Sequence, residues 1–298
     1  TPTELARRAE EVARMGGLEC EIWERERILV EGMNLLAAVN AGSREEPRFI
    51  RLRYRPDKPS KRRIVLIGKG LTFDAGGLCL KPAKGMQDMK CDMSGGALVL
   101  AVMAAVAVRK PKSEVIALIP STENMPGGAA ARPGDVVASL GGKTVEIINT
   151  DAEGRLILAD TLGYAAKLEP TVILDHATLT GACMVALGPY DAGLFSNSDP
   201  ETDRLLRAAA ATGEQFWRLP LAEDLKDMLH SEVADVKNVG EQYGGAITAA
   251  LFLRHFVGKT PWIHLDIAGP AYLEKATSYA PRGGTGFGVP TLLRFIEP

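Results

Sequence analysis

The chain has 298 residues, which is long enough for one large α/β domain or two small ones. Hydrophobic residues make up 46% and charged residues 24%, as is usual for globular proteins. Its 35 basic and 37 acidic residues give a formal net charge of −2, which provides no bulk attraction for nucleic acid or anionic lipid. Four cysteines without a C-x-x-C spacing indicate reduced, mostly buried thiols. The longest apolar stretch, 95–108, is too short to span a bilayer, and no apolar signal core begins the chain. We therefore expect a cytoplasmic protein.

A Thr-Pro-Thr-Glu capping box opens the chain and predicts a helix to about Met15, ended by two glycines. Apolar residues at helical spacing predict a second helix over 24–40. The remaining predicted elements are strands at 49–54, 64–67, 115–119, 145–148, 172–174 and 262–265, and helices at 95–108, 154–167, 203–211 and 246–257. This alternation predicts an α/β, three-layer α/β/α fold, in which a central mixed, mostly parallel sheet is covered by helices on both faces. Because no linker divides the chain, we expect a single domain over 1–298.

Three polar segments follow predicted strands, after Ile67, Ile148 and Leu174. Ligands of such sheets bind in loops beyond the carboxyl ends of the strands. We therefore expect these segments to form the functional site.

Four carboxylates in or near these segments could converge: Asp74, Asp92, Asp151 and Glu153. Crowded carboxylates raise one another's pKa unless a cation neutralises them. Two divalent cations about 3.5–4 Å apart, bridged by carboxylate and water, would remove that penalty and activate a water molecule. Any one of these acids alone is better explained as a turn former or helix cap, and only the whole set, beside two lysines and an arginine, favours a metal site.

At these residues the chain resembles a known family. Residues 149–156, Asn-Thr-Asp-Ala-Glu-Gly-Arg-Leu, are identical to the signature octapeptide of the leucyl aminopeptidases, the cytosol aminopeptidase family. Segments 68–77 and 90–95 resemble that family's two metal loops, and 177–182 and 262–269 resemble further blocks in the same order. The resemblance implies a two-metal-dependent aminopeptidase, a hydrolase that releases N-terminal amino acids from peptides by attack of metal-activated water, with a leucine-like preference.

The resemblance implies metal ligands residue by residue: Lys69, Asp74, Asp92, Asp151 and Glu153. Asp74 and Glu153 match the ligands that serve both metals. A lysine ligand must be neutral, which a neighbouring dication achieves by lowering its pKa. Mn²⁺ or Zn²⁺ is the expected ion, and Co²⁺ or Mg²⁺ also suits such oxygen-rich ligands.

Lys81 and Arg155 match the family's catalytic residues. By this resemblance, Lys81 stays charged and stabilises the oxyanion, and Arg155 holds a bicarbonate ion that relays a proton. The resemblance also implies a substrate-binding set of Lys81, Met89, Asn149, Thr178, Leu179 and Gly181. Ordinary loop and core packing is the alternative for Met89, Thr178, Leu179 and Gly181. Asn149 could orient either Asp151 or the substrate, and a simple turn is the alternative.

Full-length members of this family carry a further N-terminal domain, which we expect to be absent here, so that 1–45 would be leading helices from the family's linker region. Members are typically hexamers, which implies a homohexamer. The expected partners are peptide substrates, with no membrane.

Two other functions remain open. A DNA-binding or regulatory role is disfavoured by the near-neutral charge, although strong salt-dependent DNA binding would support it. Another two-metal hydrolase, such as a phosphoesterase, is disfavoured by the lysine ligand and the octapeptide. Residues 61–63 are a candidate basic patch or a solvated loop.

Histidine ligands are not expected, because the sequence has no H-E-x-x-H motif. His176 and His264 lie in predicted strands and are assigned structural roles, although His176 could support the site. Asp266 could likewise support the site or form a turn at the end of its strand.

Overall fold

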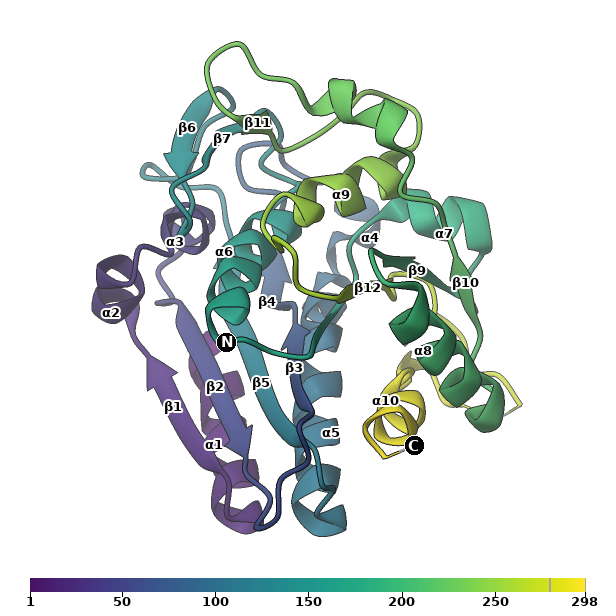
Figure 1. The fold of residues 1–298 in the computed structure, drawn as a ribbon. Coiled ribbons are helices and arrows are strands. Elements are labelled where there is room, and N and C mark those ends of the chain that lie inside the picture. Colours follow the sequence, from purple (N-terminus) through teal and green to yellow (C-terminus); the bar gives the residue numbers. More distant parts are fainter. Residues whose placement is uncertain (279, 298) are drawn as a thin grey trace.

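The computed structural model describes residues 1–278 and 280–297. At its centre is a nine-stranded mixed sheet with strand order β1-β2-β5-β3-β8-β12-β9-β10, in which β4 also pairs with β5 (Figure 1). Its strands are β1 (Glu19–Trp23), β2 (Arg48–Tyr54), β3 (Arg63–Gly68), β4 (Gly70–Asp74), β5 (Glu114–Asn124), β8 (Val172–Ala177), β9 (Ala192–Ser196), β10 (Phe216–Arg218) and β12 (Trp262–Asp266). The strands β5, β3, β8 and β12 run parallel, whereas β1, β2 and β9 each pair antiparallel with a neighbour.

Helices cover both faces of this sheet. One face carries α1 (Pro2–Gly16), α5 (Ser94–Arg109), α8 (Asp199–Thr212) and α10 (Val289–Ile296), and the other carries α2 (Arg25–Val30), α3 (Asn34–Asn40), α6 (Gly154–Lys167), α7 (Gly181–Leu187) and α9 (Gly245–Arg254). Successive residues of β3 point into opposite layers, because side chains alternate along a strand. Ile64 and Leu66 join the α5 core, and Val65 and Ile67 join the α6 core. The predicted three-layer fold is confirmed.

The prediction of one continuous helix over 24–40 is wrong. The chain forms two helices, α2 and α3, because Gly32 between them has a positive φ of 82° that ends the first. The second helix has its own cap from a distant residue. The Asp160 carboxylate of α6 accepts hydrogen bonds from the backbone N–H groups of Leu35, at 2.8 Å, and Leu36, at 3.1 Å.

One prediction about the polar segments is also wrong, and one strand that is predicted correctly lies outside the central sheet. A loop is expected at residues 70–74, but they form β4, which pairs with β5 and ends at Asp74. The strand expected at 145–148 is β7 (Thr144–Ile147), which lies outside the central sheet. It forms a small separate sheet with β6 (Asp135–Ala138) and β11 (Val236–Lys237). The octapeptide segment therefore leaves this small sheet and enters α6 on the central one.

The longest apolar stretch forms the buried helix that its composition predicts, α5. Two short elements precede it, α4 (Ala83–Met86) and η1 (Met89–Met93). Residues 83–109 are together long and apolar enough to cross a membrane, but 56% of the most apolar window is buried inside the molecule, as in the core helix of a folded domain. The four cysteines, all within the described residues, are free as predicted, but only Cys183 among them is fully buried.

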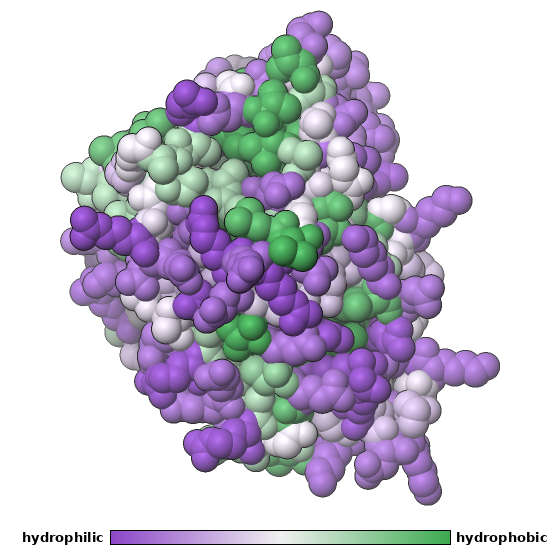
Figure 2. Space-filling view, turned by 90° about the vertical axis from the view of Figure 1, so that its left-hand side faces the viewer, coloured by the Kyte–Doolittle hydropathy of each residue, from purple (hydrophilic) through white to green (hydrophobic). Residues whose placement is uncertain are grey.

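Strand β1 forms one edge of the central sheet and pairs only with β2 among the described residues. On the face that includes this side of the molecule, hydrophilic side chains predominate and apolar patches are interspersed between them (Figure 2). Glu19 and Glu21 place charges along the edge strand, which discourages pairing with another chain. The remaining elements are η2 (Glu223–Leu229), β13 (Tyr272–Leu273) and β14 (Gly283–Gly284).

Candidate metal centre

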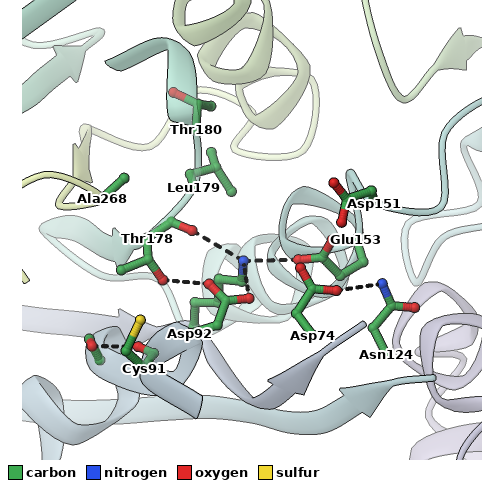
Figure 3. Close-up of polar contacts among 12 residues, drawn as sticks. Asp74, Cys91, Asp92, Asn124, Asp151, Glu153, Thr178, Leu179, Thr180 and Ala268 are labelled. Carbon is green, nitrogen blue, oxygen red and sulfur yellow. Dashed lines mark hydrogen bonds and ion pairs between the residues drawn. The ribbon is translucent and has the colours of Figure 1, made fainter. Parts of the chain in front are cut away.

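All five residues expected to hold metal come together beyond the carboxyl ends of β3, β4 and β8 (Figure 3). Lys69 follows β3, Asp74 ends β4, Asp92 lies in η1, and Asp151 and Glu153 precede α6. One carboxylate oxygen from each of Asp74, Asp151 and Glu153 lies within 4.8 Å of the other two. Side chains from distant parts of the sequence therefore share one small volume.

Two lysines link the carboxylates in pairs. The Lys69 Nζ lies 2.8 Å from Asp92 Oδ2 and 2.9 Å from Glu153 Oε1. The Lys81 Nζ lies 2.7 Å from Asp74 Oδ2 and 2.6 Å from Asp151 Oδ1. Each ammonium group thus lies between carboxylates from separate segments, where it partly offsets their repulsion.

Burial dominates the electrostatics of the cluster. It raises the pKa of Asp92 to about 6 and the pKa of Glu153 to about 8, and it also raises the pKa of Asp151. Burial acts to lower the pKa of Lys69, but the charges of Asp92 and Glu153 outweigh it and raise that pKa. Two ammonium groups therefore do not fully offset four crowded carboxylates, and Lys69 would bind a metal only after losing its proton.

The residues fit divalent cations. Glu153 Oε2 is buried and has no hydrogen-bond partner among the described residues, so an acceptor inside the cluster lacks a donor. The surrounding ligand atoms are carboxylate oxygens with one amine, which are suitable ligands for divalent ions such as Mn²⁺ and Zn²⁺.

Neutral donors fix the orientation of two carboxylates. Asp74 Oδ1 accepts hydrogen bonds from Asn124 Nδ2, at 2.8 Å, and from the Gly76 backbone N–H, at 2.9 Å. Asp92 Oδ1 accepts one from Thr178 Oγ1 at 2.6 Å. In each case the other carboxylate oxygen faces a lysine of the cluster. Asn124 has no local sequence signal, because it acts from the end of β5, fifty residues after Asp74.

The octapeptide segment is tied to the segment that carries Asp74. The Thr150 hydroxyl donates to the Gly76 carbonyl oxygen at 2.6 Å and accepts from the Cys79 backbone N–H at 2.8 Å. Asn149 Oδ1 accepts from the Asp151 backbone N–H at 2.8 Å. Asn149 therefore orients Asp151, one of the two roles considered for it.

The remaining predicted site residues lie on the segments that carry the cluster or directly after β8. Arg155 is buried at the start of α6, donates from Nη1 to the Asn238 carbonyl oxygen at 2.8 Å, and has its pKa lowered to about 10 by burial. Met89 begins η1, and Gly181 begins α7. Thr178 and Leu179 follow β8 and are half-buried beside Ala268 (Figure 3).

His176 and His264 lie fully buried in β8 and β12. His264 Nδ1 lies 2.6 Å from Asp175 Oδ1, and His176 Nδ1 lies 3.1 Å from the Ile67 carbonyl oxygen. Asp266 accepts a hydrogen bond from the Thr180 hydroxyl at 2.7 Å and others from nearby backbone N–H groups. These residues therefore order the strand ends beneath the cluster.

An apolar cavity of about 380 Å³ lies beside η1. Its wall includes Cys91 and Met93, on either side of Asp92, together with Ile267, Ala271 and Phe287. Of the residues expected to line the substrate subsite, Met89, Thr178, Leu179 and Gly181 are not part of this wall.

Comparison with known proteins shows the family of this chain. Residues 1–293 match the family described as the cytosol aminopeptidase family, catalytic domain. Probable cytosol aminopeptidases from Koribacter versatilis, Solibacter usitatus and Aquifex aeolicus are 47%, 52% and 51% identical over 100%, 99% and 99% of this chain. The chain spans only 58%, 62% and 60% of the length of these relatives.

A solved structure described as the bottromycin maturation enzyme BotP in complex with Mn is similar to this chain, with a TM-score of 0.95 and 43% sequence identity. The similarity covers 99% of this chain and 66% of that one. The family match over nearly all residues, the sequence identities and the shared fold lead to one conclusion. The chain belongs to the cytosol aminopeptidase family and corresponds to its catalytic domain.

Proposed function

We propose that this chain provides the active site of a metal-dependent aminopeptidase, which releases N-terminal amino acids from peptides. One observation carries the proposal, namely the convergence of Lys69, Asp74, Asp92, Asp151 and Glu153 in one buried cluster. Membership in the cytosol aminopeptidase family supports the same function. The near-neutral charge gives no support to a main role in nucleic-acid binding.

We assign two divalent ions to these five residues, with Asp74 and Glu153 serving both. When bound, such ions lower the pKa of a water molecule and polarise a carbonyl group. Manganese is supported by the similar BotP structure, which is a complex with Mn. Zinc suits the ligands as well, and cobalt or magnesium is an alternative.

Lys81 and Arg155 supply fixed positive charges in this proposal. Burial acts to lower the pKa of Lys81, but Asp74 and Asp151 outweigh it, so the ammonium remains charged at neutral pH. A charge at that place would stabilise the negative charge that develops on the oxygen of the scissile carbonyl group. The buried Nε of Arg155 has no partner among the described residues, which leaves a donor for a planar anion such as bicarbonate.

A leucine-like preference is supported by apolar surroundings. Leu179 and Ala268 lie over the cluster (Figure 3), and Met89 is half-buried at the start of η1. We assign Met89, Thr178, Leu179 and Gly181 to the subsite for the N-terminal side chain, with Lys81 and Asn149 beside the peptide. By family resemblance we further propose a homohexamer that works in the cytoplasm, with residues 1–298 as one catalytic domain.

The function can be tested by metal depletion and add-back on a panel of aminoacyl anilides and short peptides. We expect depletion to abolish hydrolysis and Mn²⁺ or Zn²⁺ to restore it, with leucine-like residues cleaved fastest. N-acetylated substrates are the control, because a blocked amine cannot be recognised as an N-terminus. Equal hydrolysis of acetylated substrates would exclude an aminopeptidase, and hydrolysis of aryl phosphate in place of the anilides would indicate a phosphoesterase.

A further inference from the structure

Two buried amides hold the segment that carries Asp151: Asn124, which donates to the Thr150 carbonyl oxygen at 3.0 Å, and Asn238. Asn238 directly follows β11 and is 0% exposed. Its backbone N–H donates to the Glu146 carbonyl oxygen of β7 at 2.9 Å, which continues the parallel pairing of the two strands. Asn238 therefore lies beside the point where the chain leaves β7 for the cluster.

The Asn238 carboxamide directs both of its ends at the backbone of residues 148–152. Oδ1 accepts hydrogen bonds from the N–H groups of Ile148, at 2.8 Å, and Asn149, at 3.2 Å. Nδ2 donates to the carbonyl oxygens of Asn149, at 2.7 Å, and Ala152, at 3.4 Å. Since an amide presents an acceptor and a donor side by side, it takes the place of a strand neighbour, which residues 148–152 do not have in the described part of the chain.

These contacts bear directly on two of the assigned ligands. Asn149, whose backbone N–H and carbonyl groups are both held, accepts from the Asp151 backbone N–H through its own side chain. Ala152, whose carbonyl is held, lies between Asp151 and Glu153 in the chain. The Asn238 amide therefore holds the backbone on both sides of Asp151, whereas Thr150 between these contacts is tied to the segment that carries Asp74.

We propose that Asn238 is a positioning residue that sets the places of Asp151 and Glu153 and so strengthens metal binding by this half of the cluster. This role rests on the proposed function, because it assumes that the cluster binds divalent ions. The main chain of Asn238 has a separate part, since its carbonyl oxygen accepts from Arg155 Nη1. A side-chain substitution therefore leaves the acceptor of Arg155 in place.

Two variants and one matched control test this role. Asn238→Ala removes the amide, and Asn238→Asp keeps its size and acceptor but replaces the donor by a second acceptor. The control is Asn40→Ala. Asn40 is 1% exposed, donates to the Glu45 carbonyl oxygen and to Thr122 Oγ1 at 2.8 and 3.1 Å, and accepts from Arg25 Nη1. All three substitutions break buried hydrogen bonds, but only those at 238 remove contacts with residues 148–152, which lead to Asp151 and Glu153.

Binding of Mn²⁺ to the metal-depleted protein is measured by calorimetric titration, and the stability of the metal-free protein by urea unfolding. We expect both Asn238 variants to lose roughly 10- to 100-fold in Mn²⁺ affinity, as removal of a group that orients a ligand does, while Asn40→Ala keeps its affinity. All three should be less stable. The Mn²⁺ concentration for half-maximal anilide hydrolysis should rise with the loss of affinity, and the turnover number should recover at saturating Mn²⁺.

Unchanged Mn²⁺ affinity in both Asn238 variants, or an equal loss in Asn40→Ala, would overturn the positioning role. If Asn238→Ala does not fold, Asn238→Asp decides, because it keeps the shape of the side chain. Failure of the proposed function is recognised separately. In that case the unsubstituted protein itself does not cleave anilides, or does not bind Mn²⁺, whatever the variants do.

Discussion

Glu153 shows how strongly the cluster depends on a counter-charge. Its side chain is buried, one oxygen meets Lys69, and the other has no hydrogen-bond partner among the described residues. Asp151 is less buried and meets Lys81 instead. In the proposed site, Glu153 and Asp151 are metal ligands, and bound ions would balance their negative charge. Lys81 contacts carboxylates of the cluster but is not itself a metal ligand.

This difference predicts separate effects of three substitutions. Glu153→Ala and Asp151→Ala should abolish turnover because metal is lost. Lys81→Ala should keep its metal content and lower kcat roughly 10²- to 10³-fold, since a charge that stabilises the oxyanion is removed. Metal content by mass spectrometry and kcat with an aminoacyl anilide provide the measurements. Equal metal loss in all three variants would contradict the separate role of Lys81, and the exposed Lys61→Ala serves as a control.

At the residue level, the sequence predicts those groups whose chemistry is visible in their own segment. Four acids and two lysines in glycine-rich segments carry such a signal, and they do lie together. Asn124 and Asn238 carry none. Their amides act on residues fifty and about ninety positions away, and an isolated asparagine has no pattern that reveals a distant backbone partner.

At the level of elements, the position of Asp92 depends on a close approach between α5 and the central sheet. A Cβ atom on Gly95 would lie 2.0 Å from the His176 carbonyl oxygen, so only glycine fits there. The next residue donates from its backbone N–H to the Lys69 carbonyl oxygen at 2.8 Å. Backbone contact thus places η1 and the start of α5 against the ends of β3 and β8.

Gly95→Ala should therefore push α5 away from the sheet. We expect the free energy of unfolding to fall by about 1–3 kcal/mol, as for other overpacked sites, and Mn²⁺ affinity to fall with it because Asp92 moves. Gly163→Ala in α6 is the matched control. Its new Cβ would meet only Leu140, at 3.5 Å, so we expect a gain of up to about 1 kcal/mol from helix propensity. Similar losses in both variants, measured by urea unfolding, would exclude the steric explanation.

The parallel strands β8 and β12 are joined by a fully buried pair, Asp175 and His264. Burial acts to lower the pKa of His264, but the charge and hydrogen bond of Asp175 raise it above the usual 6.5. A raised pKa contributes stability that is present below the usual value and is lost as pH rises through the higher one.

Wild type should therefore exceed His264→Gln in unfolding free energy by more at about pH 6 than at about pH 9. Glutamine is chosen because it keeps an N–H donor for Asp175 without a titratable group. Urea unfolding at both pH values provides the measurement. A difference that is constant or grows with pH would show that His264 is neutral in the folded protein.

Local patterns are sufficient for the long helices but not for short or edge elements. The predicted helix over 154–167 coincides with α6, because its many apolar residues favour a buried helix without a distant partner. The loop expected at 70–74 is wrong, and the strand predicted at 145–148 forms but lies outside the central sheet, because pairing partners decide both outcomes. A glycine-rich stretch becomes β4 only beside β5, and β7 joins a separate sheet through β11, about ninety residues later.

For the molecule as a whole, the cluster lies at the carboxyl ends of the strands, between segments that lead into the two helical layers. Asp92 belongs to η1, which leads into α5 on one face, and Glu153 directly precedes α6 on the other. Lys69 and Asp74 come from β3 and β4 between them. Bound ions would therefore connect both layers to the sheet, and metal binding should stabilise the entire fold rather than one loop.

Removing metal should therefore destabilise the whole protein. At a metal concentration 100-fold above the dissociation constant, each site adds about 2.7 kcal/mol to the free energy of unfolding. Thermal unfolding, followed by circular dichroism and calorimetry, should thus occur as one transition at a lower Tm after chelation and return to the original Tm when Mn²⁺ is added. Glu153→Ala is the control, because its Tm should not respond to chelation or to Mn²⁺. If Glu153→Ala shows the same shift in Tm as the unsubstituted protein, the stabilising ion binds elsewhere, and the cluster does not connect the two layers.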